Sequence, residues 1–338
     1  KIYKNLNPNP KTTPRLDGGH FVMQTHPLVT DGEQSRTAVV DWNGDGRLDL
    51  IRGSGNGWVT YYENVGTNID PVFSSRVKLQ ADGKEIRLIN GPRDCPQGPS
   101  EPNSGYTAPV VVDFDGDGDL DLIVGDMRGY QTYFENIGTR SQPKLAAGRL
   151  IEVDGQRRSF GWRNEIAVGD IDGDGKVEIV STAYDDRHIS IYKPSTVQDD
   201  PKVLKVVKVA PLILDSGEAL LPPHAGGNNN GDYMMKLVDW DGDGDLDLFV
   251  ESVYYIWYYE NVGTSTAPKF KYHGRFQVGG KDLIVSGHAG SIDAVDWNGD
   301  GRPDLIIGGE SGWTYYFERT FLDGNLPRAM LGSVQLRP

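Results

Sequence analysis

The fold is decided by a stretch that recurs five times along the chain, first as AVVDWNGDGRLDLIRG (38–53). It returns as VVVDFDGDGDLDLIVG (110–125), AVGDIDGDGKVEIVST (167–182), KLVDWDGDGDLDLFVE (236–251) and DAVDWNGDGRPDLIIG (293–308). Each copy consists of an apolar run, an Asp/Gly-rich loop and a second apolar run. The first aspartates of successive copies are 57 to 72 residues apart. Similarity at such a spacing is typical of repeat architectures.

A second, aromatic element follows the repeated stretch. It reads WVTYYENVGT (58–67), YQTYFENIGT (130–139), WYYENVGT (257–264) and WTYYFERT (313–320), and the third copy has the weaker version ISIYKP (189–194). A fourth run often comes next, as in RVKLQ (76–80) and KDLIVSG (281–287). Several short strands at regular spacing, with turn residues between them, are typical of the blades of a β-propeller. We therefore expect an all-β fold, a propeller of four-stranded blades.

The repeats also suggest how the chain is divided. We expect residues 1–338 to form a single β-propeller domain, with five blades that start near residues 34, 106, 163, 232 and 289. Residues 1–30 are expected to be a partial blade, because IYKNLNPNPKTTPRL (2–16) is similar to YYENVGTNIDPVF (61–73). Since that blade lacks its inner strands here, we expect further residues upstream in the intact protein. Seven blades in all are expected, with six as the alternative.

The composition excludes several classes of protein. No apolar run approaches the ~18 residues of a membrane span, and the single cysteine, Cys95, excludes an intrachain disulfide and a cysteine-based metal site. No signal peptide begins at Lys1, so we expect any targeting segment to have been removed. With 34 Lys and Arg against 48 Asp and Glu, the formal net charge is −14, which argues against nucleic-acid binding. We expect a monomer.

The Asp/Gly-rich loops have the ligand spacing of a calcium site. In the first loop Asp41, Asn43, Asp45 and Asp49 stand at positions 1, 3, 5 and 9, and position 7 offers a backbone carbonyl. Calcium takes about six to eight oxygen ligands, and glycines at positions 4 and 6 let the chain wrap round an ion. An ordinary Asp/Gly turn is the alternative, but five copies at one spacing favour the metal. The corresponding positions of the other loops are Asp113, Asp115, Asp117 and Asp121; Asp170, Asp172, Asp174 and Glu178; Asp239, Asp241, Asp243 and Asp247; and Asp296, Asn298, Asp300 and Asp304.

The charge balance supports structural calcium. The ligand positions hold 18 carboxylates, and without them the chain has 30 acidic against 34 basic residues. Carboxylates gathered without a cation would repel one another. We therefore expect about five bound calcium ions that add to the folding free energy and take no part in chemistry.

The face of the propeller opposite these loops is the expected place for a ligand, because irregular loops on a rigid scaffold often carry function. Two inter-blade loops predicted on that face are long, 90–106 and 220–233. Histidine, arginine and tyrosine side chains are expected to converge there near the axis. The candidates for substrate binding are Arg36, Tyr106, Arg128, Arg187, His188 and Tyr254, and the candidates for catalysis are His224, His288, Tyr233 and Arg163.

The DxDGDGxxDL loops followed by YYENVGT resemble the FG-GAP/VCBS repeat family over roughly residues 1–320. This family includes integrin α-subunit propellers, fungal propeller lectins and extracellular carbohydrate-active enzymes. The irregular repeat length and the ending GWTYYFERT (312–320) are more similar to secreted seven-bladed lyases and glycosidases that act on rhamnose–uronate glycans. The resemblance implies an extracellular or periplasmic protein whose partner is a polysaccharide or oligosaccharide, although one fold hosts several functions.

Several functions follow from these residues as hypotheses. A polysaccharide lyase cleaving a uronate glycan by β-elimination would need a cation such as Arg163, a base such as His224 or His288, and an acid such as Tyr233. A glycoside hydrolase would need two carboxylates, and nothing in the sequence selects a pair. A lectin with one site per blade would repeat its binding residues, whereas the residue five before the first Asp differs in every copy, which favours one asymmetric site and hence the enzyme. An integrin-type interaction propeller ranks last.

Overall fold

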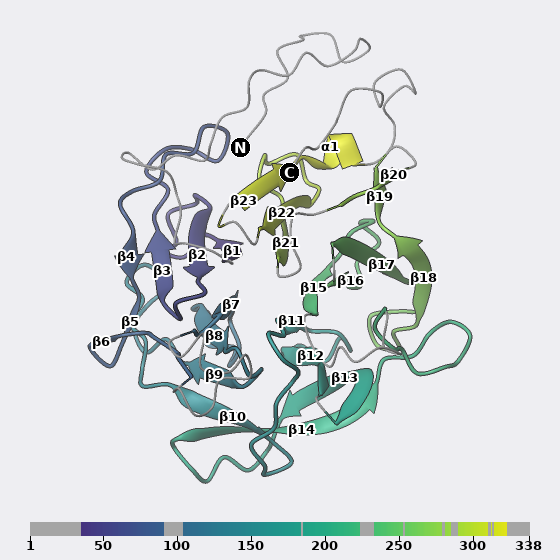
Figure 1. Ribbon diagram of the computed structural model, residues 1–338, viewed down its shortest axis with the longest axis horizontal. Helices are drawn as coiled ribbons and strands as arrows, with labels where there is room; N and C mark the ends of the chain where they lie inside the picture. Colours follow the sequence, from purple (N-terminus) through teal and green to yellow (C-terminus); the bar gives the residue numbers. More distant parts are fainter. Residues whose placement is uncertain are drawn as a thin grey trace.

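The computed structural model describes residues 35–90, 104–183, 185–223, 233–252, 254–278, 281–284, 290–309, 312 and 314–322. In these ranges the elements are β-strands, apart from the short helix α1 (Arg319–Leu322). The sheets stand around a central axis like the blades of a propeller (Figure 1). The all-β propeller predicted from the repeats is the fold observed. No helix in this part of the chain has the length and hydropathy needed to cross a membrane.

Each repeat forms one blade, whose strands are antiparallel and follow one another outward from the axis. The first blade is β1 (Arg36–Val40), β2 (Asp49–Gly53), β3 (Val59–Tyr62) and β4 (Val77–Lys78). The second is β7 (Ala108–Val112), β8 (Asp121–Gly125), β9 (Gln131–Phe134) and β10 (Arg149–Val153), and the third is β11 (Ala167–Gly169), β12 (Glu178–Ala183), β13 (Asp186–Pro194) and β14 (Val203–Pro211). The fourth is β15 (Met234–Val238), β16 (Asp247–Ser252), β17 (Tyr255–Asn261) and β18 (Phe270–Arg275), and the described part of the fifth is β21 (Ser291–Val295), β22 (Asp304–Gly308) and β23 (Thr314–Phe317).

Two further features lie at the outer edges of the blades. Short hairpins are formed by β5 (Gln80–Ala81) with β6 (Lys84–Glu85) and by β19 (Gln277–Val278) with β20 (Lys281–Asp282). The outer strands β10 and β14 pair in parallel, so the second and third blades share one eight-stranded sheet.

The ring closes between the first blade and the fifth. Going round the axis, the inner strands are β1, β7, β11, β15 and β21, and β21 lies against β1. The N–H of Thr37 donates to Oγ of Ser291 (3.0 Å), and the N–H of Val39 donates to the carboxylate of Asp293 (2.6 Å). Within the described residues five blades complete the ring, so the expected seven blades, or six, are not confirmed. The predicted partial blade, residues 1–30, lies outside these residues.

The hydrophobic core lies between the blades, because alternate residues of each strand face opposite neighbours. In β17, Trp257 and Tyr259 pack in the cluster shared with the third blade, whereas Ile256 and Tyr258 pack toward the fifth. Both faces of a blade are therefore buried. A chain with only 37% hydrophobic residues can fill such a core because each blade completes the core of the next.

Neighbouring blades approach one another closely where the second strand ends. A Cβ on Gly53 would lie 1.9 Å from the carbonyl oxygen of Thr107, and one on Gly308 would lie 2.3 Å from that of Ser35. Each of these backbone oxygens belongs to the entry of the next blade. The glycines that end β2 and β22 are thus required by inter-blade packing.

Candidate functional site

The Asp/Gly loops connect the first and second strands of their blades, and the position-1 aspartate organises each of them. In the first loop Oδ1 of Asp41 accepts a hydrogen bond from the N–H of Asp45 (3.0 Å), and Oδ2 accepts one from Gly46 (3.0 Å). The glycine at position 6 makes the same bond in every loop, at 2.8–3.2 Å. Its φ lies between 83° and 97°, a conformation that favours glycine.

These loops gather acidic side chains. In three of them the carboxylate oxygens lie within 4.8 Å of one another and could hold a metal ion. In the first and fifth loops position 3 is an asparagine, and Oδ1 of Asn43 and of Asn298 accepts the N–H of the position-5 aspartate. All the side-chain donors are oxygens, a set that suits calcium or magnesium rather than a transition metal. The three acid groups are Asp113, Asp115 and Asp117; Asp170, Asp172, Asp174 and Glu178; and Asp239, Asp241 and Asp243.

The position-9 aspartate has a second role, since it ties the loop to the third strand of its blade. Asp49 is fully buried and accepts hydrogen bonds from the N–H of Trp42 (3.1 Å), the hydroxyl of Tyr61 (3.0 Å) and the N–H of Asn64 (2.7 Å). The corresponding three donors bind Asp121, Asp247 and Asp304. Sequence analysis predicted these aspartates only as metal ligands. The hydrogen-bond role depends on strand register, which brings the tyrosine opposite the loop.

Burial of these carboxylates gives the ion-free protein a pH dependence. Burial raises the pKa of Asp49, Asp121 and Asp247 from 3.8 to about 6, although their hydrogen bonds oppose the shift. The folded state therefore binds more protons than the unfolded state between these values, and stability falls as the pH rises through the window. The test is urea unfolding in a calcium chelator at several pH values. The free energy of unfolding should be smaller above pH about 6 than near pH 3.8, because these carboxyl groups are ionised in both states above that window. The variant Asp247→Asn should flatten the slope; an unchanged slope would contradict this assignment.

The third loop differs from the others in its partners. Its position 9 is Glu178, and Ile191 of β13 stands where the other blades have the tyrosine. Nζ of Lys193, also on β13, lies 2.6 Å from a carboxylate oxygen of Asp172, 2.6 Å from Asp174 and 3.5 Å from Glu178. The hydrogen bond from Lys193 holds the pKa of the Asp174 carboxyl below its usual value.

On the opposite face, the structure buries four of the eight described residues that were predicted to bind or cleave a substrate. Arg36 is fully buried, Arg163 is 2% exposed, and Tyr106 and Tyr233 are buried as well. The guanidinium of Arg163 lies 3.8 Å from the ring centroid of Tyr106, so the structure brings these two predicted residues together as a cation–π pair. The hydroxyl of Tyr233 donates to the carbonyl of Pro223 (3.4 Å).

The other predicted ligand residues lie on three different blades. Arg128 follows β8, Arg187 and His188 are in β13, and Tyr254 precedes β17. Nδ1 of His188 is 2.8 Å from the carboxylate of Asp186, and Tyr254 is 45% exposed. The N–H of Arg163 donates to the carbonyl of Met127 (3.1 Å), which places the backbone of Arg163 beside that of Arg128. The two histidines proposed as bases, His224 and His288, lie outside the described residues.

The described inner strands enclose a narrow cavity at the axis. Its volume is about 20 Å³, room for one water molecule. It is lined by the inner strands, and among its lining residues are Glu165, Lys236 and Asp293. Nζ of Lys236 lies 2.5 Å from the carboxylate of Asp293, and burial raises the pKa of Glu165 to about 8. A sugar ring does not fit into this cavity.

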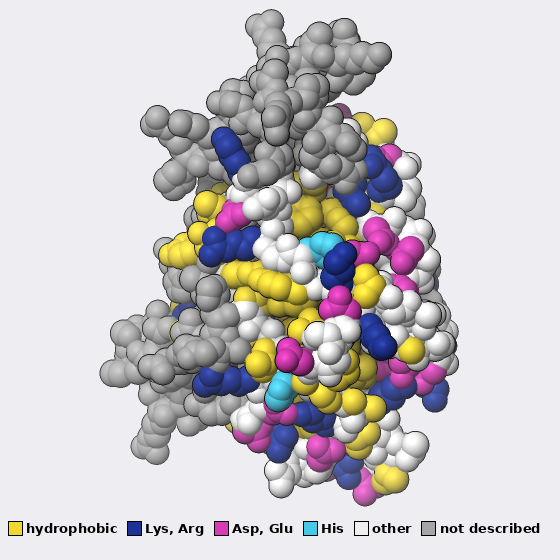
Figure 2. Space-filling view, turned by 90° about the vertical axis from the view of Figure 1, so that its right-hand side faces the viewer, with side chains coloured by type: hydrophobic (Ala, Val, Ile, Leu, Met, Phe, Trp, Pro, Cys, Tyr) yellow, Lys and Arg dark blue, Asp and Glu magenta, His cyan; other side chains and the backbone are white. Residues whose placement is uncertain are grey.

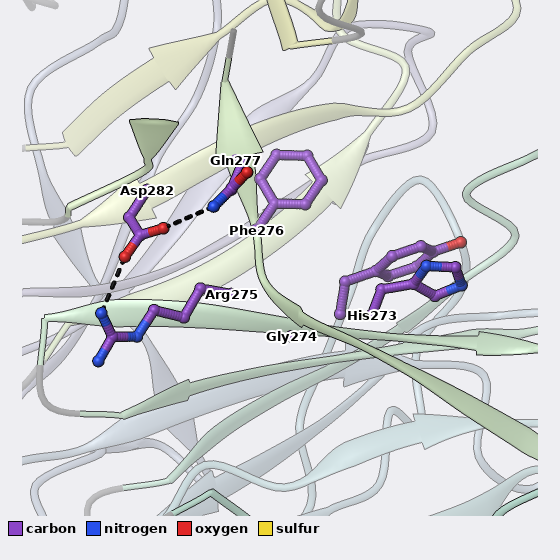
Figure 3. A pocket seen from close by; sticks show the side chains of 7 residues that line it. His273, Gly274, Arg275, Phe276, Gln277 and Asp282 are labelled. Carbon is purple, nitrogen blue, oxygen red and sulfur yellow. Dashed lines mark hydrogen bonds and ion pairs between the residues drawn. The ribbon is translucent and has the colours of Figure 1, made fainter. Parts of the chain in front are cut away.

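A larger pocket lies at the outer edge of the fourth blade, around β18 and the β19–β20 hairpin (Figure 3). Its volume is about 460 Å³. The carboxylate of Asp282 accepts hydrogen bonds from Arg275 (2.8 Å) and Gln277 (2.9 Å), and the ring of His273 stacks on Tyr258 with centroids 5.4 Å apart. The pocket is lined by Tyr258, His273, Gly274, Arg275, Phe276, Gln277 and Asp282.

Sequence analysis did not find this pocket, because nothing in the sequence indicates that Tyr258 of the aromatic element and Asp282 of the fourth run lie beside residues 273–277. Figure 2 looks onto the side of the molecule that carries β18. Hydrophobic side chains are exposed there among acidic and basic ones, and a histidine lies beside a Lys or Arg. This mixture of apolar and charged side chains at the edge of one blade is visible only in the three-dimensional structure.

The repeated loops and strands now define a family. The pattern of the FG-GAP-like repeat matches residues 41–124, 113–181 and 239–307, which together make up more than half of the chain. The chain belongs to the FG-GAP-like repeat family. This confirms the family resemblance read from the sequence, while the specific likeness to rhamnose–uronate lyases is not shown.

Several solved structures are distantly similar to this FG-GAP-like repeat protein. An Agrocybe aegerita lectin, described for its recognition of non-reducing terminal N-acetylglucosamine, is 19% identical over 85% of this chain, with a TM-score of 0.41; the chain spans 63% of the lectin's length. The Photorhabdus luminescens Tc holotoxin pore is 15% identical over 91% of this chain and 12% of its own, with a TM-score of 0.36. BBS1N in complex with ARL6DN is 11% identical over 96% of this chain and 97% of its own, with a TM-score of 0.38. No curated protein sequence matches the chain.

Proposed function

We propose that this FG-GAP-like repeat propeller is stabilised by calcium in its Asp/Gly loops and binds carbohydrate in the pocket at the edge of its fourth blade. The pocket carries the proposal. The exposed ring of His273, stacked on Tyr258, and the half-buried ring of Phe276 offer ring surface to the C–H face of a sugar. Arg275, Gln277 and Asp282 offer donors and acceptors to its hydroxyl groups.

Size and pre-organisation support this reading of the pocket. A volume of about 460 Å³ falls within the range of small-molecule sites. Asp282 fixes Arg275 and Gln277 by hydrogen bonds, and the guanidinium of Arg275 also lies 3.6 Å from the ring centroid of Tyr255. Side chains held in place before binding lose less conformational entropy when the ligand arrives.

Calcium is proposed as the loop ion on the chemistry of the donor set. Positions 1, 3 and 5 offer oxygens from one tight turn, which suits a hard cation of flexible coordination. Position 9 and the carbonyl of position 7 would complete the set. We also propose an extracellular or periplasmic location, where weak calcium sites of extracellular modules are filled.

Binding in the pocket predicts that Asp282→Asn weakens the affinity for oligosaccharide at least tenfold. The change removes the negative charge that orients Arg275 and replaces one of the two acceptor oxygens by an amide donor, and hydrogen bonds to a charged group are stronger than those between neutral groups. A panel of oligosaccharides would first identify a ligand, and isothermal titration calorimetry would then compare the variants.

The matched control is Glu85→Gln. It breaks an exposed ion pair of the same length, 2.8 Å to Lys78, at the outer edge of the first blade. This variant should bind like the wild type. Equal affinity of Asp282→Asn and the wild type, or no binding to any member of the panel, would overturn the proposed site.

Cleavage of a uronate glycan by β-elimination is a second candidate function. The observation in its favour is the buried guanidinium of Arg163 beside Tyr106, since a desolvated guanidinium binds a carboxylate strongly. Incubation with uronate glycans tests it. An unsaturated product that absorbs ultraviolet light would indicate a lyase. New reducing ends without an unsaturated product would indicate a hydrolase. Binding of the glycan without cleavage would support the lectin function.

A further inference from the structure

The residue that follows the aromatic pair of the third strand differs in charge between the third blade and the others. In the third blade this residue is Lys193. The strand register is the same, because Tyr192 pairs with Ile179 as Tyr62 pairs with Leu50. In the four other blades the position is occupied by Glu63, Glu135, Glu260 and Glu318.

The ammonium group of Lys193 lies among the oxygens that an ion would need. Its Nζ is 2.6 Å from Asp172, 2.6 Å from Asp174 and 3.5 Å from Glu178. These three residues and Asp170 form the acid group of the third loop, whose oxygens lie within 4.8 Å of one another. Glu178 is fully buried, so bulk water does not solvate its carboxylate.

The other loops have no comparable cation among the described residues. Among the ion pairs of the described residues, Arg47 contacts Asp45, Arg140 lies 3.5 Å from Asp41, and Arg302 lies 3.5 Å from Asp300. No ion pair in the described part of the chain reaches the acid groups of the second and fourth loops. The glutamates of the third strands add negative charge instead: Glu135 acts on Asp115, Glu260 on Asp241 and Glu318 on Asp304.

A calcium ion and this ammonium group would compete for the same oxygens. Calcium needs its oxygens at about 2.3–2.6 Å on all sides, and two of those available are already held by Lys193. An ion could enter only if the lysine left, which would break three ion pairs and place two cations close together.

We infer that Lys193 serves as the permanent cation of the third loop, so that four of the five loops load calcium and the third blade is stable without it. The inference rests on the calcium loading proposed above. It replaces the sequence-based expectation of about five ions.

Counting the bound ions tests this directly. Native mass spectrometry and calorimetric titration with calcium chloride are expected to give four ions per chain for the wild type. Lys193→Glu restores the residue of the other blades and should bind one more. The matched control is Lys205→Glu, which makes the same charge change in an exposed ion pair with Asp199 and should bind four.

Two ligand variants assign the ions to loops. Asp113→Asn should lower the count by one, whereas Asp170→Asn should leave it unchanged. If circular dichroism shows that Lys193→Glu is unfolded, the ion count is made on Lys193→Gln instead. That variant removes the positive charge without adding a negative one. Five ions in the wild type, or an unchanged count in both Lys193 variants, would overturn the inference alone. No ion in any variant would overturn the calcium proposal itself.

Discussion

Removal of calcium is expected to cause the largest loss of stability that a change of solution can produce in this protein. If four loops are each saturated about 100-fold above Kd, the bound ions contribute about 10 kcal/mol to the free energy of unfolding. For a chain of this size that corresponds to roughly 20 °C in the midpoint of thermal unfolding. Without an ion, neighbouring carboxylates such as Asp113, Asp115 and Asp117 repel one another across a few ångströms.

Differential scanning calorimetry in calcium chloride and in a chelator measures this effect. The two buffers must match in ionic strength, because salt alone screens the exposed loop charges. Sodium chloride in place of calcium chloride serves as the control and should leave the midpoint at its low value. Equal midpoints in calcium and in chelator would contradict the account.

The second large effect is expected at the position-9 aspartate, and it should persist in chelator. Asp247→Ala should lower the free energy of unfolding by about 3–5 kcal/mol. The side chain is 1% exposed and accepts hydrogen bonds from the N–H of Trp240 (3.1 Å), the hydroxyl of Tyr258 (3.0 Å) and the N–H of Asn261 (2.7 Å). The variant leaves two buried N–H groups and one half-buried hydroxyl without this acceptor. Urea unfolding in chelator measures the cost.

Asp243→Ala is the matched control, because it changes position 5 of the same loop. Its side chain is exposed and accepts the N–H of Asp245 (3.1 Å). In chelator it should cost less than about 1 kcal/mol, as expected for a surface substitution. In calcium both variants should weaken ion binding. Equal costs of the two variants in chelator would show that the position-9 aspartate has no structural role of its own.

The parts of the fold that the sequence predicts are local ones. Alternating apolar residues, the Asp/Gly loop and the aromatic run are repeated within each blade, so β2, the loop before it and β3 can all be recognised from residues 38–62. The glycine at position 6 is likewise a local requirement, since its φ is positive in each loop.

The number of blades could not be read in this way. It depends on the angle between neighbouring blades, which many inter-blade contacts set together. The closing contact joins Thr37 to Ser291 and Val39 to Asp293, residues 254 apart in the sequence. No repeated motif indicates that pairing.

The ligand site was the least predictable part. Arg36 and Arg163 were expected to face a ligand because they stand at the entries of inner strands, but these entries converge on the axis and bury the side chains. The pocket of β18–β20 lies at the edge of one blade, and most of its lining residues lie outside the repeated loop and aromatic elements. Lys193 can be read from ISIYKP (189–194), but the sequence does not show that its ammonium group contacts three carboxylates of the third loop.

The most direct test of the central claim, that metal ions fill the Asp/Gly loops, is an anomalous difference map from crystals grown in calcium. The account predicts one peak within each of the first, second, fourth and fifth loops, with carboxylate oxygens about 2.3–2.6 Å from the ion. In the third loop it predicts Nζ of Lys193 in place of a peak. Crystals grown in calcium that show no peak in any of these loops would contradict the claim.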